Sequence, residues 1–255
     1  MTADYPAFTV RLAVTEADLL ASQRLRYRVF VTELGGDGPL VDHAAGLERD
    51  RFDPHFEHLV LVDGNQQPGR HVVGLYRLLT EAGAARVGQF YSENEYDLSP
   101  LRGSGRRLLE LGRSCVDPAY RGGAAVYHLW HGLAQEVTRR GIEILFGVAS
   151  FHGTDPAALA QPLAYLHHSH LAPPALRVRA RVHQSMDLLP GGLIDRRAAM
   201  LATPALIKAY LRLGGFVGDG AFVDRAFNTT DVCLVMDLAR MNPSQRAIYV
   251  KARPG

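Results

Sequence analysis

The sequence predicts an α/β or α+β fold. Apolar residues follow strand-like and helix-like periodicities in alternating segments through residues 8–150. The chain has 255 residues, of which 47% are hydrophobic, and this suffices to bury a sizeable core in one large domain or two small ones. No repeat, low-complexity segment or stretch typical of a flexible linker interrupts the pattern.

The first expected elements are a strand and a helix. Residues 8–14 alternate in polarity, which predicts a strand. Thr15 follows as an expected N-cap, and Glu16 and Asp18 carry negative charge that favours a helix start. Residues 17–34 then carry apolar side chains at helical spacing, and two glycines end that segment.

The later elements are predicted from apolar runs bounded by turn-forming residues. The polar segment 64–70 is expected to connect a hairpin, Gly141 is expected to end a helix, and a Pro- and Arg-rich stretch separates the last two helices. The expected strands are 58–63, 71–79, 106–116, 142–150 and 231–238, and the expected helices are 127–141, 155–169 and 203–213.

Composition excludes several classes of function. The net charge of +2 gives no long-range attraction to nucleic acid, and no RNA-binding motif is present. The sequence has no signal-peptide pattern and no apolar run of the roughly 20 residues that a membrane-spanning helix needs. We therefore expect a cytoplasmic protein, with peripheral contact at the inner face of the membrane left open. Neither the two cysteines nor the 11 histidines form a known metal motif, so no metal ligand is expected.

A Gly-rich turn between a strand and a helix is the first feature that indicates chemistry. Arg121, Gly122, Gly123 and Ala124 precede the helix at 127–141. Small residues let backbone amides approach a ligand, and a helix N-terminus attracts anions, so the turn suits a pyrophosphate or the phosphate of a phosphopantetheine arm. An ordinary helix-start turn explains the same residues equally well.

This turn resembles the acyl-donor loop of GNAT acetyltransferases. Four further segments resemble, in order, the acyl-homoserine-lactone synthases, a GNAT-like group: RLRYRVF at 24–30, ERDRFD at 48–53, GLYRLL at 74–79 and ELGR at 110–113. The C-terminal half departs from those synthases. Its segments 165–181 and 203–238 resemble the ornithine N-acyltransferases of bacterial ornithine-lipid synthesis, and that resemblance extends from about residue 10 to residue 240.

The resemblance implies a GNAT-like fold with a mixed sheet flanked by helices, in which 1–255 form a single domain and 154–214 form a family-specific insertion. It also implies transfer of a 3-hydroxyacyl group from acyl carrier protein to the α-amine of ornithine, which yields a lyso-ornithine lipid. The phosphopantetheine arm of the carrier protein would be the donor, with no tightly bound cofactor. Seven positions match the signature of the synthases: Arg26, Phe30, Asp50, Asp53, Arg77, Glu110 and Arg113.

Glu110 and Arg113 are the expected catalytic residues. Amide formation from a thioester needs a deprotonated amine and a polarised carbonyl, and a carboxylate near the end of a central strand serves the first need. Glu110 would act as base directly or through water. An ion pair of Glu110 with Arg113 or with another arginine is the alternative interpretation, and both roles are compatible.

Asp50 and Asp53 are expected to bind the ammonium groups of ornithine, because carboxylates only accept hydrogen bonds. The alternative is a solvated loop with surface ion pairs to Arg49 or Arg51. Arg26 would hold the ornithine carboxylate or would steady the two aspartates.

Three other expected substrate residues have structural alternatives. Arg77 would share the role of Arg26. Phe30 would line the substrate or, as we favour, pack in the core. His58 opens a strand beside the polar loop and would be an active-site polar group or a structural histidine.

The resemblance further implies a bulged strand whose backbone amides at Ser114, Cys115 and Val116 bind the thioester, while Arg121–Ala124 hold the pantetheine arm. Cys115 as an acylated nucleophile is a less favoured alternative, because an isolated cysteine in an apolar run is usually a small buried hydrophobe.

Arg177, Arg179 and Arg181 alternate with small apolar residues, so an extended chain would point them to one face. Such a face suits docking of the acidic acyl carrier protein. A solvated surface or contact with anionic lipid explains the same residues, and Lys208 and Arg212 would join that surface.

Two rival functions stay open at this level. An acyl-homoserine-lactone synthase would need S-adenosylmethionine, and the C-terminal half argues against it. A noncatalytic module that binds acyl carrier protein or lipid is the alternative from another class.

Overall fold

The computed structural model describes residues 6–241. These residues divide into two compact units, which are described in turn. The first unit comprises 6–87 and Leu111–Gly141, and the second comprises Gly88–Glu110 and 142–241. The organisation of 1–255 as a single domain with an insertion at 154–214 stays a prediction.

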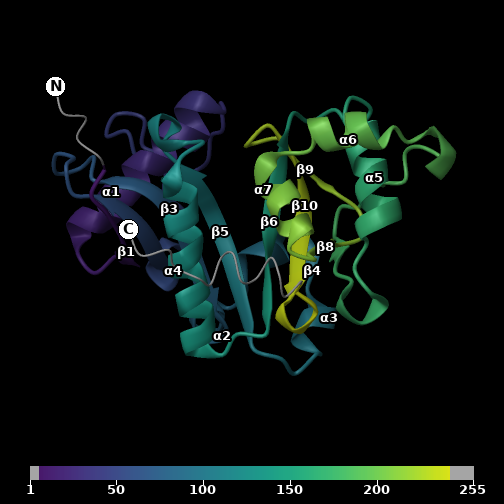
Figure 1. Cartoon of the computed structure of the whole chain (residues 1–255), viewed down its shortest axis with the longest axis horizontal. Helices are drawn as coiled ribbons and strands as arrows, with labels where there is room; N and C mark the ends of the chain where they lie inside the picture. The colour runs from purple at the N-terminus through teal and green to yellow at the C-terminus, as the bar shows by residue number, and fades with distance from the viewer. Residues whose placement is uncertain (1–5, 242–255) are drawn as a thin grey trace. The chain divides into compact units, whose positions relative to one another are not determined.

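The first unit contains an antiparallel array of strands in the order β1-β2-β3, with β5 next to β3. Its strands are β1 (Phe8–Leu12), β2 (Glu57–Asp63), β3 (Val72–Thr80) and the end of β5 (Leu108–Val116). Its helices are α1 (Glu16–Arg26), the π-helix η1 (Tyr27–Glu33), α2 (Glu81–Val87), α4 (Ala124–Arg140) and the 3₁₀ turns η2 (Asp53–His55) and η4 (Pro118–Tyr120) (Figure 1).

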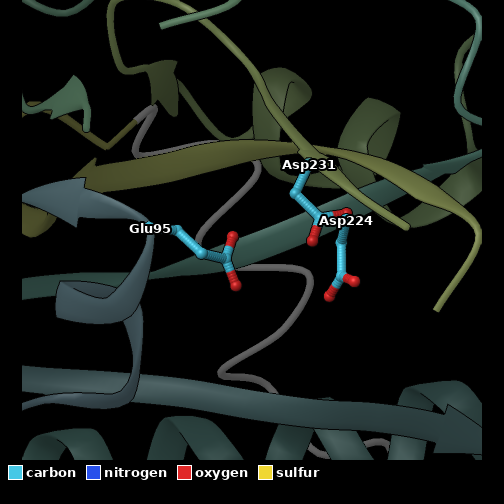
Figure 2. A group of neighbouring side chains, drawn as sticks. All are labelled: Glu95, Asp224 and Asp231. Atoms are coloured by element: carbon cyan, nitrogen blue, oxygen red, sulfur yellow. The ribbon is translucent and has the colours of Figure 1, made fainter. Parts of the chain in front are cut away.

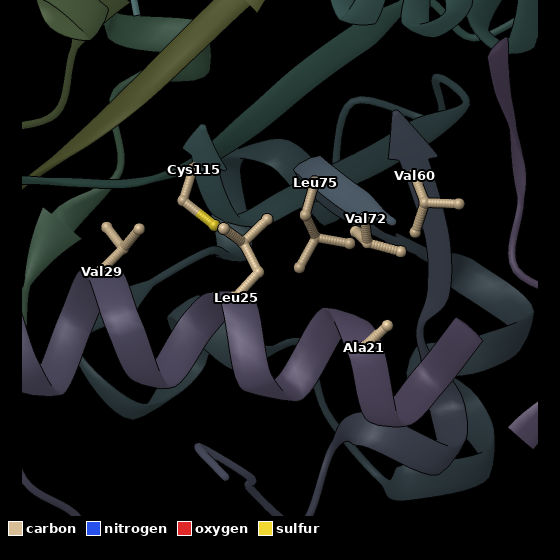
Figure 3. Close-up of a cluster of buried hydrophobic side chains, with 7 residues drawn as sticks. All are labelled: Ala21, Leu25, Val29, Val60, Val72, Leu75 and Cys115. Atoms are coloured by element: carbon tan, nitrogen blue, oxygen red, sulfur yellow. The ribbon is translucent and has the colours of Figure 1, made fainter. Parts of the chain in front are cut away.

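Helices α1 and α4 cover opposite faces of these strands. Val60 and Leu75 face α1 and pack with Ala21, Leu25, Val29, Val72 and Cys115 in one buried cluster (Figure 3). Gly74, one residue from Leu75, lies instead against Leu129 of α4. Alternating side chains of β3 therefore meet both layers, which explains why this strand is almost entirely apolar and buried.

Close approach of α4 to the sheet depends on a glycine. A Cβ atom at Gly132 would collide with the Val10 side chain of β1. The helix ends at Arg140 and is capped by Gly141, whose φ of 59° lies in the left-handed region that glycine adopts most easily. That end is where the sequence predicts it, whereas the start lies at Ala124, three residues before the predicted one.

The first helix shows one confirmed feature and one error. Thr15 caps α1, as the sequence predicts, and Asp18 also completes a capping box. The helix ends at Arg26 and continues to Glu33 with π-helical hydrogen bonds, although helical spacing predicts one helix over 17–34. Apolar spacing over seven residues does not distinguish the two periods.

The second unit contains a mixed sheet. β5 runs parallel to β6, β6 is antiparallel to β10, and β10 pairs with both β8 and β9. Its strands are the start of β5, β4 (Tyr96–Asp97), β6 (Ile144–His152), β7 (Arg179–Ala180), β8 (Phe216–Val217), β9 (Phe222–Asp224) and β10 (Thr229–Asp237). Its helices are α3 (Ser99–Arg102), α5 (Ala160–His170), α6 (Arg196–Ala202) and α7 (Ala205–Arg212), with 3₁₀ turns η3 (Tyr91–Asn94), η5 (Pro174–Leu176), η6 (Gly191–Leu193) and η7 (Leu238–Arg240).

Long apolar elements match the prediction in this unit, and short ones do not. The sequence predicts only a connection between the last two helices, but α6 lies within that stretch. The preceding helix, α5, begins at Ala160 rather than at 155. Asp195 caps α6 by accepting two backbone hydrogen bonds, a signal hidden by the surrounding arginines and prolines. No helix among the described residues is long and apolar enough to cross a membrane.

Candidate active site

A buried network of opposite charges lies in the first unit. Its carboxylates come from the irregular segment between η1 and β2, and its guanidinium groups come from the end of α1, from β3 and from β5. The members of this ion-pair network are Arg26, Glu48, Asp50, Asp53, Arg77 and Arg113.

Asp53 joins two of the arginines. Its Oδ1 accepts hydrogen bonds from Nη1 of Arg26 at 2.5 Å and from Nη1 of Arg77 at 2.7 Å. The same nitrogen of Arg77 lies 2.8 Å from both carboxylate oxygens of Asp50. Gln23 donates to the other oxygen of Asp53 at 3.2 Å. Asp53 is therefore fixed from both sides.

Glu48 joins the remaining arginine to the network. It accepts a hydrogen bond from Nε of Arg26, and its Oε1 lies 3.1 Å from Nη2 of Arg113. That Nη2 also lies 3.4 Å from Asp50. Arg113 has a φ of 47° inside β5, so the strand departs from extended geometry there, directly before Ser114.

Charge balance makes burial of the network tolerable. Arg26 and Arg77 are fully buried, and Glu48 is 1% exposed. Burial raises the pKa of Glu48, but Arg113 and Arg26 lower it further, so that its pKa is about 2. Arg26 and Arg77 likewise hold the pKa of Asp53 below its usual range against the effect of burial. Three carboxylates thus face three guanidinium groups, so the formal charges of the network balance.

His58 is a neutral neighbour of the network. Burial lowers its pKa to about 4. Its Nε2 lies 3.3 Å from the carbonyl oxygen of Asp53, which only accepts, so Nε2 carries the proton and Nδ1 is an acceptor. Nδ1 of His58 and Nη2 of Arg26 are buried without a hydrogen-bond partner among the described residues. One acceptor and one donor are therefore available to a ligand.

Glu110 belongs to the second unit and is held by neutral donors. Its Oε1 accepts hydrogen bonds from the backbone N–H of Ser92 at 2.6 Å and from the Ser92 hydroxyl at 2.5 Å. Its Oε2 accepts the backbone N–H of Tyr91 at 2.7 Å. The side chain is 1% exposed. It ties the turn η3 to β5, a contact that the sequence does not indicate.

The Gly-rich turn leads directly into α4, and its last residue, Ala124, is already the first residue of the helix. Gly122 has a φ of 77°, and a Cβ there would meet nothing within 4 Å. Gly123 is the N-cap and supplies no side-chain bond to the first turn of the helix. Arg121 is held by Glu33, through contacts of 2.5 and 2.7 Å, and donates to the carbonyl of Val116. The turn therefore offers an open backbone at a helix N-terminus.

Cys115 and Phe30 belong to the core or its edge. The Cys115 side chain packs in the buried cluster against α1, and burial raises the pKa of its thiol to about 12. A protonated, buried thiol is a poor nucleophile, so the acylated-cysteine alternative finds no support here. Phe30 is half-buried against the same cluster, and the Arg113 guanidinium lies 5.8 Å from its ring centroid.

The structure excludes one interpretation of the polar loop for Asp53. Asp50 and Asp53 pair with the buried Arg77 rather than with Arg49, which pairs with Asp42 instead. The interpretation of a solvated loop is therefore wrong for Asp53, which is 6% exposed.

Glu48 was not predicted as a site residue, although it opens the ERDRFD segment. A glutamate beside an arginine at the start of a polar stretch looks like a surface ion pair. Only the approach of Arg113 and Arg26 shows that it is buried.

Comparison with known proteins assigns this chain to a family. The acetyltransferase (GNAT) domain family matches residues 25–131. The L-ornithine N(alpha)-acyltransferase of Rhodobacter capsulatus is 60% identical over 251 residues, which cover 98% of this chain and 97% of that protein. The L-ornithine N(alpha)-acyltransferase of Brucella abortus is 42% identical over 246 residues, 94% of this chain and 88% of that protein.

Solved structures show the same fold. FeeM, an N-acyl amino acid synthase from uncultured soil microbes, superposes with a TM-score of 0.52 at 14% identity and 95% coverage of each chain. The acyl-homoserine-lactone synthase LasI gives a TM-score of 0.53 at 14% identity, with 98% of this chain and 100% of that chain covered. The predicted GNAT-like fold is confirmed. The chain is therefore an acyltransferase and belongs to the L-ornithine N(alpha)-acyltransferase family.

Proposed function

We propose that this enzyme moves a 3-hydroxyacyl group from the thioester of acyl carrier protein to the α-amine of L-ornithine, which yields a lyso-ornithine lipid. The observation that carries the proposal is the 60% identity over 98% of the chain to a protein named L-ornithine N(alpha)-acyltransferase. The amine attacks the thioester carbonyl, the C–S bond breaks, and the thiol of the pantetheine arm leaves with the proton that the amine loses.

The ion-pair network supports binding of an amino acid. The network is neutral, and ornithine with a deprotonated α-amine is also neutral overall, since it carries one carboxylate and one ammonium. Binding there adds no net charge to a buried region. In this proposal Nη2 of Arg26 donates to the carboxylate of ornithine, and Nδ1 of His58 accepts an N–H of the substrate.

Glu110 and Arg113 stay our candidate catalytic residues. Glu110 would take the proton of the amine, directly or through water. The left-handed conformation of Arg113 turns the backbone directly before Ser114, where the donor amides for the thioester oxygen are expected. Because the Cys115 side chain packs in the core, only its backbone would take part.

The donor side of the proposal rests on two surfaces. The open backbone at Gly122 and the first turn of α4 suit the phosphate of a phosphopantetheine arm. Exposure alternates along residues 178–181, as the sequence pattern predicts. Arg179 and Arg181 are exposed, whereas Val178 and Ala180 are buried. An exposed basic strip of this kind would orient an acidic carrier protein.

The test is a reaction of the purified protein with a 3-hydroxyacyl carrier protein and L-ornithine, followed by thiol release and mass spectrometry. We expect one acyl group, located on the α-nitrogen by fragmentation. The same acyl group on coenzyme A tests the donor, and lysine, glutamine and glycine test the acceptor. Absence of an acylated product with every amino acid would refute the proposal, and a lactone formed from S-adenosylmethionine would replace it.

Docking of the carrier protein has its own test. Arg179→Glu should raise the KM for the acyl carrier protein about tenfold with little change in kcat, because exposed charges mainly steer association. Arg139 of α4 is a matched control, since its side chain is 62% exposed against 60% for Arg179. An equal effect of Arg139→Glu would show that only net charge matters.

A further inference from the structure

Three carboxylates outside the proposed active-site residues converge in the second unit. Glu95 precedes β4, Asp224 ends β9, and Asp231 lies in β10. One oxygen from each lies within 4.8 Å of the others, and Glu95 and Asp231 are buried. Figure 2 shows the three side chains directed toward a common region.

Strand register explains the convergence. Thr229 of β10 lies directly opposite Asp224 of β9, so their side chains share one face of the pair. Asp231 is two residues further along β10 and points to the same face. The hydroxyl of Tyr96 donates to the carbonyl oxygen of Asp231 at 2.9 Å, which fixes the chain beside Glu95 against β10.

Thr229 supplies a second, independent observation. It is 8% exposed, and its Oγ1 is buried without a hydrogen-bond partner among the described residues. Its place opposite Asp224 puts the Thr229 side chain on the face of the strand pair that carries the carboxylates. A buried hydroxyl left without a bond is costly, whereas a bound ligand would satisfy it.

The four oxygen donors favour a hard cation. Ca²⁺ takes carboxylate and neutral oxygens at about 2.3–2.6 Å, so opposite ligands lie up to about 5 Å apart. Mg²⁺ binds at about 2.0–2.1 Å, which limits that distance to about 4.2 Å. The three carboxylate oxygens lie within 4.8 Å of one another, which is inside the range for Ca²⁺ ligands. A divalent ion also offsets more of the buried negative charge than an ammonium group does.

We propose that Glu95, Asp224, Asp231 and Thr229 form a binding site for a divalent cation that prefers Ca²⁺ to Mg²⁺. Such an ion would link the segment before β4 to the edge formed by β9 and β10. The assignment does not depend on which amino acid the enzyme acylates.

The experiment titrates chelator-treated, desalted full-length protein with CaCl₂ or MgCl₂ alone in a calorimeter. We expect one Ca²⁺ per chain with a Kd between about 1 μM and 1 mM, and weaker binding of Mg²⁺. Asp224→Asn should weaken Ca²⁺ binding at least tenfold. This variant keeps an amide oxygen that still accepts the backbone N–H groups of Ala226 and Phe227, so the local turn is retained.

Two further variants make the test specific. Thr229→Val removes one neutral ligand and should weaken binding about threefold while the fold is kept. Asp187→Asn changes an exposed carboxylate of the same unit, 54% exposed, and should leave binding unchanged. Thermal unfolding gives a second measurement, because Ca²⁺ should raise the melting temperature of the native protein and of Asp187→Asn but not that of Asp224→Asn.

Three results would overturn the proposal. The first is an absence of Ca²⁺ and Mg²⁺ binding at millimolar concentration. The second is binding that Asp224→Asn and Thr229→Val leave intact. The third is protection by ornithine, but not by Ca²⁺, that depends on Asp224, since this would assign the carboxylates to the ammonium group of the acceptor.

Discussion

Two buried glutamates of this enzyme are stabilised by different kinds of donor. Glu48 and Glu110 are each 1% exposed. Glu48 accepts from guanidinium groups that belong to α1 and β5, in the first unit. Glu110 accepts from two backbone N–H groups and one hydroxyl of the adjacent residues Tyr91 and Ser92, in the second unit.

The difference determines what a mutation does. A guanidinium that is removed from the ion-pair network leaves a buried carboxylate without its counter-charge, and several distant segments lose their connection. A neutral donor that is removed from Glu110 costs one hydrogen bond within one local turn. The first arrangement should therefore be far less tolerant than the second.

The largest effect is expected for Arg26→Leu. It leaves Glu48 and Asp53 buried with one counter-charge fewer, which should lower the free energy of unfolding by about 3–5 kcal/mol and the melting temperature by about 10 °C. Arg49→Leu is the control, because Arg49 is 43% exposed and pairs with Asp42 at the surface. Its cost should stay below about 1 kcal/mol. Calorimetry that gives equal costs would show that burial is unimportant here.

The second effect is a pH dependence of stability that comes from His58, the neutral neighbour of the ion-pair network. His58 has a native pKa of about 4, lowered by burial from the ordinary 6.5. Between these values the unfolded chain binds a proton that the native chain does not, so stability falls as pH decreases from about 6.5 to about 4. The loss should approach about 3 kcal/mol. Chemical unfolding of His58→Leu at several pH values should show a flatter profile in this window, whereas His152→Leu at an exposed position should retain the slope of the native protein.

The sequence predicts the long elements because their patterns are redundant. β6, β10 and α4 each carry several apolar residues at the correct period, so one ambiguous residue does not matter. β7, β8 and β9 have two or three residues each and are defined by their partners. Their existence depends on register, which a local pattern does not contain.

The same limit applies to the sites. The ordered motifs identify Arg26, Asp53 and Arg77, yet the pairing among them depends on which strands are adjacent. Glu95 and Asp231 are separated by more than a hundred residues and carry no common motif. The carboxylate cluster in the second unit depends on the pairing of β9 with β10, which a local sequence pattern does not contain.

The third effect tests Glu110 itself. Glu110→Gln replaces one acceptor oxygen by an amide NH₂ group, which then faces the donors of Tyr91 or Ser92. The substitution should therefore cost about 1–3 kcal/mol of stability. If Glu110 is the base, kcat should also fall at least a hundredfold. Ser92→Ala is the matched variant, because it removes one donor but keeps the carboxylate. Equal losses of kcat in both variants would assign Glu110 a purely positioning role.

The smallest effect on stability and turnover is expected for substitution of Cys115. The charges of the ion-pair network have opposite effects on the pKa of its thiol. Burial is the main cause that raises the pKa of its thiol to about 12, while Arg26 lowers it and Glu48 raises it. Because the nearby charges oppose one another, burial controls reactivity, and the native protein should react with iodoacetamide at pH 8 far more slowly than the unfolded chain. Cys115→Ala should cost about 1 kcal/mol and retain kcat, since only the backbone at this position is proposed to contact the thioester. Two results together would contradict this expectation: rapid alkylation of the native protein that abolishes turnover, and an inactive Cys115→Ala variant. They would require a reactive thiolate at Cys115 and an acyl-enzyme intermediate.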